Sequence, residues 1–221
     1  MGRMHDTVTV TGTGTARATP DVAVLRLSVE VRAAILAEAY EGAAATAKKV
    51  VDAALEAGIP RSDLATSGLY VRPEMDWQYR SGKIVGYFAG EGFTVKSRDL
   101  GRTPELLDAV VRAAGDALRI HGLALEVDDP AAALAAAQEA AFDDARAAAE
   151  RLARRAGRSL GPAIRIDVAG PLAPGMPVPF VRAAAVASSA EQMPIEAGEA
   201  ELRATVTVAW RLAEPDDASL T

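Results

Sequence analysis

Residues Thr7–Val31 read TVTVTGTGTARATPDVAVLRLSVEV, and this stretch decides the fold class. Val8 and Val10 alternate with threonines, which predicts a short first β-strand. The glycines that follow predict a Gly-Thr turn, and Pro20-Asp21 predicts a new start. The second strand alternates strictly: Leu25, Leu27, Val29 and Val31 share one face, while Arg26, Ser28, Glu30 and Arg32 share the other. A period of two with one polar face predicts an antiparallel sheet that is covered on one side.

Farther along the chain, the period changes to that of helices in three places. Residues 35–57 carry apolar side chains at helical spacing and are followed by Gly58. Thr103-Pro104-Glu105 predicts the start of a second helix, with Thr103 as a capping hydroxyl. Asp128-Asp129-Pro130 predicts the start of the longest helix, where the two aspartates complement the helix dipole. The apolar face of that helix is expected to hold Leu134, Ala141, Ala145, Ala149, Leu152 and Ala156.

The segments between the helices have β character. Residues 61–98 predict a long hairpin with a mobile polar tip, RPEMDWQYRSGK. Glycines at 86, 90 and 92 in its returning strand indicate a bulge or a close backbone approach. Three further strands are predicted at 118–127, 164–168 and 201–212.

These segments predict an α+β fold with a mainly antiparallel sheet and helices packed on it, in the order β-β-α-β-β-α-β-α-β-β. We expect one domain over residues 7–212, because no linker separates two parts. Residues 171–198 contain five prolines without a clear period, which predicts a long proline-rich loop. Residues 213–221 are expected to form a frayed polar tail.

Composition narrows the classes of function. A net charge of −6 argues against a nucleic-acid partner, and the absence of cysteine excludes disulfides and thiolate chemistry. No apolar run is long enough for a transmembrane helix, so a soluble protein is expected. The start, MGRMHDTVTV, lacks the apolar core of a secretory signal, which predicts a cytoplasmic location for the chain as given. Had a signal been removed, the location would be the periplasm or envelope.

The order of these segments resembles that of the SIMPL-domain family, also called DUF541. The resemblance spans roughly residues 7–212 and rests on V-T-V-x-G-x-G at Val8–Gly14, A-G-I-P at Ala57–Pro60, the alanine-rich run at Ala137–Ala153, and P-I-E-A-G-E at Pro194–Glu199. It implies an α+β protein of a bacterial family in which many members are exported to the periplasm or envelope and some form large homo-oligomers. It brings no agreed activity, catalytic residue or cofactor.

No catalytic, cofactor-binding or metal-binding residue is predicted. Gly12-Thr13-Gly14 is similar to the start of a dinucleotide fingerprint, but a strand follows it where that site requires a helix, so a hairpin turn is favoured. His121 is expected to face solvent or lie at a sheet edge, and with His5 it cannot supply the three donors that a metal needs. The paired aspartates at 143–144 are assigned to a solvated helix face, and no G-x-S-x-G motif occurs.

The exposed aromatic residues point instead to an interface. Interfaces favour aromatic, methionine and arginine side chains. The hairpin therefore offers candidate contacts at Met75, Trp77, Tyr79, Arg80 and Tyr87, and the proline-rich loop adds Met176 and Phe180. The alternative is that Trp77 and Tyr79 fold back on the sheet.

The favoured hypothesis is a non-enzymatic, self-associating structural or scaffold component, linked to the envelope or to stress response. It needs no cofactor, and its expected partner is another copy of itself. The alternative is a small-molecule-binding module with a pocket between helices and sheet, near Gly86–Gly92. An unrecognised hydrolase is the weakest hypothesis.

Overall fold

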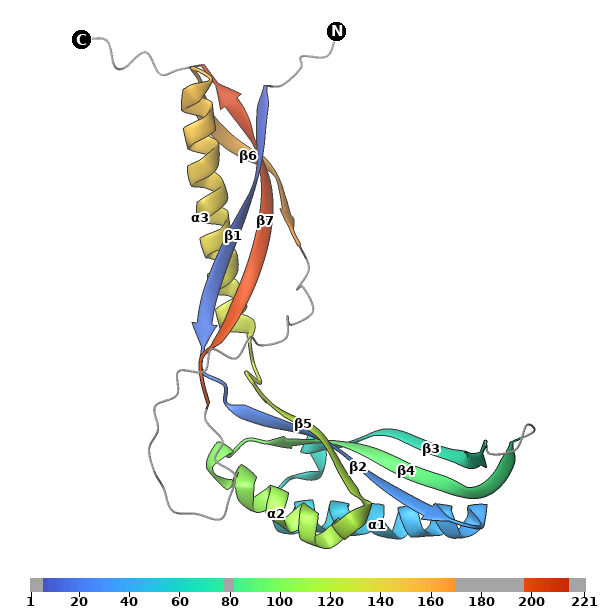
Figure 1. Cartoon of the computed structure of the whole chain (residues 1–221). Helices are drawn as coiled ribbons and strands as arrows, with labels where there is room; N and C mark the ends of the chain where they lie inside the picture. Colours follow the sequence, from blue (N-terminus) through green and yellow to red (C-terminus); the bar gives the residue numbers. More distant parts are fainter. Residues whose placement is uncertain (1–5, 78–81, 170–196, 215–221) are drawn as a thin grey trace. The chain divides into compact units, whose positions relative to one another are not determined.

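The computed structural model describes residues 6–77, 82–169 and 197–214 (Figure 1). Its strands and helices follow the predicted order, so the α+β class with antiparallel pairing is confirmed. The described residues form two compact units: unit 1 holds residues 6–19, 129–169 and 198–214, and unit 2 holds the others. A single domain over 7–212 stays a prediction, and most of the predicted loop and tail lies outside the described residues.

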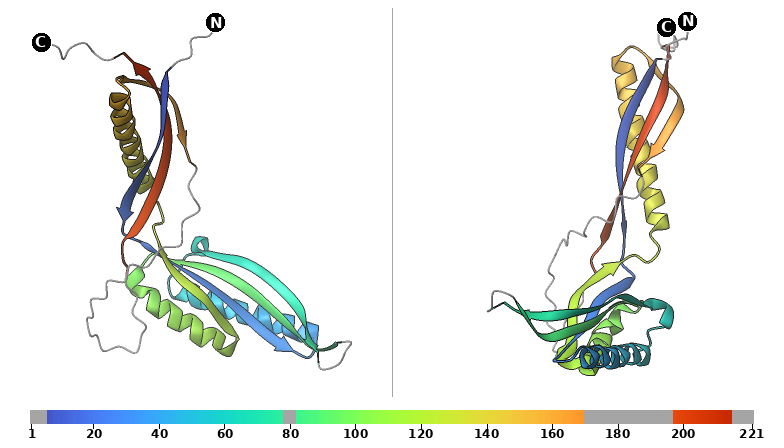
Figure 2. Two further views of the ribbon diagram at one scale, coloured as in Figure 1. Left: turned by 45° about the horizontal axis from the view of Figure 1, so that its top comes forward. Right: turned by 90° about the vertical axis from the view of Figure 1, so that its right-hand side faces the viewer.

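Unit 2 is a four-stranded antiparallel sheet covered on one face by two helices. The strands are β2 (Val22–Ala33), β3 (Leu64–Asp76), β4 (Lys83–Ser97) and β5 (Leu118–Glu126), in the spatial order β3-β4-β2-β5. The helices α1 (Leu36–Glu56) and α2 (Thr103–Ala114) lie side by side against the same face, as both views in Figure 2 show. The predicted hairpin is thus β3 and β4.

The core of unit 2 follows the alternation of β2. Leu25, Leu27 and Val29 are completely buried, or nearly so, against the helices, while Arg26 on the other face is exposed. Val50 of α1 and Val110 of α2 complete the core from the helix side. Burying each such side chain stabilises the fold by about 1.5 to 3 kcal/mol.

Unit 1 is a three-stranded antiparallel sheet with one long helix. Its elements are β1 (Thr7–Ala18), α3 (Ala131–Arg155), β6 (Ser159–Val168) and β7 (Ala200–Ala213), and the strand order is β1-β7-β6. The strand predicted at 201–212 is confirmed as β7, and its alternating side chains Val206, Val208 and Trp210 are buried under α3.

The turn and hairpin predicted for the opening stretch were wrong. Residues Gly12-Thr13-Gly14 form no turn, because β1 runs without a break from Thr7 to Ala18. The two opening strands also form no hairpin, since β1 pairs with β7 in one sheet and β2 pairs with β4 and β5 in the other.

The glycines of β1 are needed because α3 lies directly on them. A Cβ atom on Gly12 would overlap the backbone of Ala141 and Ala145, and one on Gly14 would overlap the backbone of Ala137 and Ala141. Backbone atoms cannot move aside as a side-chain end can. The G-T-G motif is therefore the surface on which the helix packs.

The predicted apolar face of α3 was also partly wrong. Leu152 is 48% exposed and Ala156 is exposed, whereas the buried row is Ala137, Ala141, Ala145, Ala149 and Ala153. Residues four apart advance by about 40° around a helix with 3.6 residues per turn. The contact row therefore winds around α3 along an i+4 ridge instead of staying on one straight face.

The predicted helix caps need two corrections. Thr103 is completely buried, and its hydroxyl bonds Ser97 Oγ and the Asp99 carbonyl, so it does not cap α2. At the start of α3, Asp129 accepts the Ala131 N–H at 3.0 Å, whereas Asp128 binds Arg98 and Lys96 instead. No helix among the described residues is long and apolar enough to cross a membrane.

Candidate functional site

The candidate contact residues of the hairpin separate into two groups. Trp77 is 75% exposed at the end of the β3–β4 hairpin, and Met75 beside it is half-buried. The ends of both side chains lie over Gly82, so a Cβ there would come within 3.1 Å of Met75 Cε and 3.2 Å of Trp77 Cζ3. Tyr87 is half-buried and packs on the small cluster of Ala39, Ala43 and Ala89, so it serves the core.

Four other candidates fall where the chain is not described. Tyr79 and Arg80 belong to residues 78–81, and Met176 and Phe180 belong to residues 170–196. Their contact roles stay predictions.

The hairpin exposes more apolar surface than the aromatic residues alone suggested. Leu69 is 59% exposed and Val71 is 39% exposed, although both lie on the helix-facing side of the sheet. They are exposed because α1 packs mainly on β4 and β2 and hardly reaches the edge strand β3. We use the name hairpin edge for the exposed residues Leu69, Val71 and Trp77, which lie along β3 and just beyond its end.

The opposite face of the same sheet carries a cluster of charged groups around Glu30. The Tyr70 hydroxyl donates to Glu30 at 2.6 Å, Arg72 donates at 3.1 Å, and Arg119 lies 3.9 Å away. Tyr70 reaches Glu30 by lying across Gly90 of β4, where a Cβ would come within 2.6 Å of the Tyr70 ring. Arg72 also stacks on Phe88 at 4.5 Å.

This cluster fixes the charge state of Glu30. The hydrogen bond from Tyr70 lowers the pKa of Glu30, opposed by desolvation and helped by Arg72 and Arg119. Desolvation, and then the bond to Glu30, raises the pKa of Tyr70. A carboxylate with two hydrogen-bond donors, Tyr70 and Arg72, and a further cation nearby is stabilised in its ionised form, which suits a structural role better than that of a proton donor.

A hydrogen-bonded pair of Ser28 and His121 was not predicted from the sequence. Ser28 Oγ and His121 Nε2 share a hydrogen bond of 2.7 Å, because a bulge in β5 turns His121 toward β2. A hydroxyl on an imidazole is the arrangement of a nucleophile and its base. Ser28 is only 8% exposed, however, and no carboxylate among the described residues pairs with His121. The pair holds the bulge against β2, and a regular strand pattern gave no sign of that bulge.

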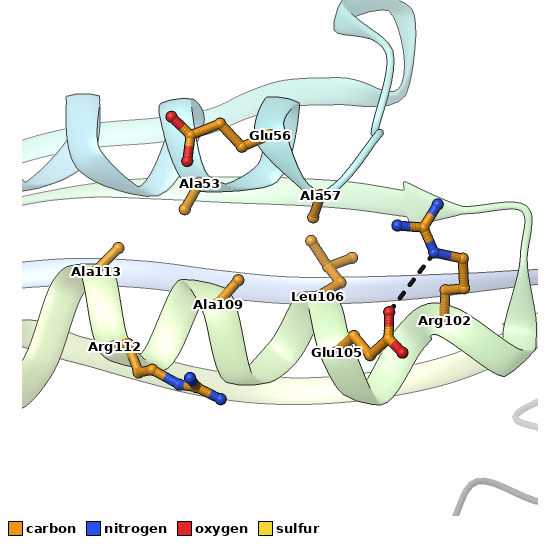
Figure 3. Close-up of a pocket in the computed structure, with 9 residues that line it drawn as sticks. All are labelled: Ala53, Glu56, Ala57, Arg102, Glu105, Leu106, Ala109, Arg112 and Ala113. Atoms are coloured by element: carbon orange, nitrogen blue, oxygen red, sulfur yellow. Dashed lines mark ion pairs between the residues drawn. The ribbon is translucent and has the colours of Figure 1, made fainter.

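A shallow groove of about 510 Å³ runs between α1 and α2 (Figure 3). Its walls are alanines that face one another. Ala53 of α1 and Ala57 just after it lie on one side, and Ala109 and Ala113 of α2 lie on the other. At one end, Arg102 and Glu105 lie 3.6 Å apart as an ion pair. The groove is thus apolar at its walls with balanced charges at its rim, which favours no particular ligand.

The small-molecule hypothesis placed a pocket near Gly86–Gly92. The groove between α1 and α2 lies elsewhere, since none of these residues lines it. The Tyr70 ring occupies the space above Gly90, and the Glu74 carboxylate lies close to Gly86. Other atoms therefore lie close to these glycines, as predicted, and at Gly86 and Gly90 they include the side chains of Glu74 and Tyr70. The small-molecule hypothesis stays a prediction.

At the end of β4, Arg98 joins two carboxylates. It donates to Asp63 at 2.8 and 3.2 Å and also to Asp128. Asp63 is 7% exposed, so its charge needs this partner. Arg98, followed by Lys96, lowers the pKa of Asp128, and the two carboxylates raise the pKa of Arg98. This cluster ties the turn before β3 to the end of β5.

Unit 1 has an apolar groove of about 420 Å³ between α3 and β6. Phe142 of α3 and Ile166 and Val168 of β6 line it.

At the other edge of the same sheet, Asp144 of α3 accepts the backbone N–H of Thr13 in the edge strand β1 at 3.0 Å. This aspartate therefore satisfies a backbone donor that β7 does not reach. The described residues contain no group of three His, Asp or Glu side chains placed to hold a metal ion.

A sequence profile described as "SIMPL: Protein of unknown function (DUF541)" matches residues 8–210, nearly the whole chain. The chain belongs to the SIMPL family. The match starts in β1 and ends in β7, so it includes both units.

Several bacterial proteins are similar to this chain over most of their length. The chain is 33% identical over 218 residues to the 26 kDa periplasmic immunogenic protein of Brucella melitensis biotype 1, covering 93% of this chain and 84% of that protein. It is 28% identical over 201 residues to the uncharacterized protein YggE of Escherichia coli strain K12, covering 90% and 78%. YggE of Edwardsiella ictaluri is 31% identical over 189 residues, covering 84% and 76%.

Proposed function

We propose that this SIMPL protein is a non-enzymatic structural component of the bacterial envelope that associates with copies of itself. The hairpin edge is its contact surface. The observation that carries the proposal is the 75% exposure of Trp77 next to an uncovered apolar strand edge. Contiguous exposed apolar surface and unpaired strand edges are typical of association sites.

The location in the envelope is supported by a relative. The Brucella protein is named a periplasmic protein, and its match covers 93% of this chain. Fractionation of the source cells tests this part of the proposal. Recovery of the protein only with the cytoplasm would contradict it.

A structural role is supported by the partners of the buried and half-buried carboxylates, which are other side chains of the same chain. Glu30 is saturated by Tyr70, Arg72 and Arg119, and Asp63 by Arg98. These groups bind one another across strands and turns, so their charges stabilise the fold. A substrate would have to compete with these bonds.

Self-association is tested by light scattering after size exclusion over a range of concentrations. The wild-type mass is expected to be a multiple of the 22.9 kDa chain. Trp77→Ala should lower the oligomer order, because the largest exposed apolar side chain of the hairpin edge is lost. Tyr40→Ala is the matched control, since Tyr40 is 47% exposed on α1. A strict monomer at every concentration would refute the proposal.

A further inference from the structure

The edge strand β6 carries an apolar row that α3 does not cover. Ile164, Ile166 and Val168 are 48%, 55% and 50% exposed, whereas Val206 and Val208 of the neighbouring strand are buried. The difference arises because α3 packs mainly on β1 and β7 and touches β6 little. Ile166 and Val168 of this row line the groove beside Phe142.

The two edges of this sheet are protected differently. On β1, Asp144 takes the Thr13 N–H, and the α3 backbone closes over the glycines. On β6, protection is limited to the first half, where Pro162 lacks an N–H and the register is irregular. Residues 165–168 contain no proline and pair with β7 in regular register, so neither of these two means of blocking an edge is present among these described residues.

The backbone of this segment is oriented for pairing. Ala169 donates its N–H to the Thr205 carbonyl of β7 at 3.1 Å. Because backbone groups alternate along the regular part of an antiparallel strand, the N–H and C=O groups of residues 166 and 168 point away from β7. Both residues carry exposed apolar side chains.

We propose that β6 pairs in antiparallel fashion with β6 of a second copy, around a two-fold axis at Ile166. The pairing rests on the proposed self-association and assigns it a second contact. Ile166 then lies opposite Ile166 of the second copy, and Ile164 lies opposite Val168. The result is a continuous six-stranded sheet with a joined apolar row on its helix side.

The charges of β6 select this register. Arg165 and Asp167 project together from the other face and bind each other at 2.7 and 3.2 Å. With the axis at Ile166, each Arg165 also lies opposite Asp167 of the second copy. An axis at residue 165 or 167 would instead place like charges directly opposite, which is destabilising.

Single cysteines test the register, because the chain has no cysteine of its own. Directly opposite residues in a hydrogen-bonded pair have Cα atoms about 5.5 Å apart, within reach of a disulfide. Ile166→Cys should therefore form a covalent dimer under mild oxidation. Ile164→Cys is the matched control, since the Cα atoms of the two cysteines would be about 14 Å apart and should not link. Ile164→Cys mixed with Val168→Cys should link as a heterodimer.

A charge exchange tests the same contact without oxidation. Arg165→Asp should raise the dimer dissociation constant about tenfold, because both symmetric ion pairs become repulsive. Adding Asp167→Arg restores opposite charges and should return the constant to within about threefold of wild type.

Three results would overturn the inference. Equal cross-linking of Ile164→Cys and Ile166→Cys would exclude the register. No cross-linking of Ile166→Cys, although Trp77→Ala still lowers the oligomer order, would leave self-association standing and remove β6 from it. Slow reaction of Ile166→Cys with a thiol reagent in a monomeric protein would show that another part of the same chain covers the row.

Discussion

At Gly90, a missing side chain allows Tyr70 to reach Glu30. Tyr70 of β3 and Glu30 of β2 stand on either side of β4, and both are in register with Gly90. A Cβ on residue 90 would come within 2.6 Å of the Tyr70 ring. The glycine therefore permits a hydrogen bond that crosses a whole strand.

We predict that Tyr70→Phe lowers the free energy of unfolding by about 1 to 2 kcal/mol at pH 7, because a bond to an ionised carboxylate is lost. The Tyr70 bond lowers the pKa of Glu30 in the folded protein from its ordinary 4.5. Stability from this bond is therefore present above pH 4.5 and is lost as the pH falls through the folded pKa. Denaturant titrations from pH 7 to pH 3 should show the difference from wild type shrinking.

The control for this prediction is Tyr40→Phe, a matched change at an exposed position of α1. It should change stability by less than about 0.5 kcal/mol at every pH. A Tyr70→Phe effect that is the same at pH 7 and pH 3 would mean that the hydroxyl does not act through the Glu30 charge.

Among the elements, α3 packs closely on β1. Two glycines on the strand meet a winding row of alanines on the helix, so the two backbones approach as closely as their atoms allow. The alanines bury little area each, yet they are completely enclosed. The contact is therefore stabilised by close packing of the two backbones, although each side chain is small.

Gly12→Ala is therefore expected to destabilise the protein by at least about 2 kcal/mol, since the new methyl group meets the helix backbone. Thermal and denaturant unfolding measure the change. Gly68→Ala in β3 is the control, because nothing lies within 4 Å of its Cβ position. That change should be neutral or stabilise by up to about 1 kcal/mol. Equal effects of the two changes would contradict the close packing of α3 on β1.

At the scale of the whole molecule, the chain passes between the two units through short connections. Only residues 19–21 separate β1 from β2, and residues 127–130 separate β5 from α3. These connections are bonded to each other, since Asp21 donates its N–H to Glu126 and accepts that of Asp128. We propose that the two units unfold together as the single domain expected over residues 7–212.

The aromatic residues allow this proposal to be measured. All four tyrosines lie in unit 2, and the buried Trp210 lies in unit 1. In a Trp77→Phe variant, tryptophan fluorescence reports unit 1 and tyrosine absorbance reports unit 2. We expect coincident unfolding curves, as for a two-state protein. Separate midpoints would identify two domains.

Much of this fold could be predicted from local pattern. The alternation of β2 and β7 places their inward faces correctly, because a period of two needs no knowledge of the partner strand. The hairpin of β3 and β4 and the start of α3 near Pro130 follow from similar local signals. For the candidate site, the exposure of Trp77 agrees with its prediction as a surface residue, while the roles of Tyr79 and Met176 remain untested.

The tertiary structure decided which strands meet, and local pattern could not. The pair Gly12 and Gly14 predicted a turn, because glycine occurs both in turns and at positions where another backbone packs closely. The local pattern does not distinguish the two. The need for glycine came from Ala141 and Ala145, more than a hundred residues away. Likewise, the exposure of Ile166 depends on where α3 stops covering the sheet. The sequence alone determined the elements and the inward faces of β2 and β7, because alternation is a local property. Long-range packing determined which residues of α3 are buried and which faces and edges stay exposed.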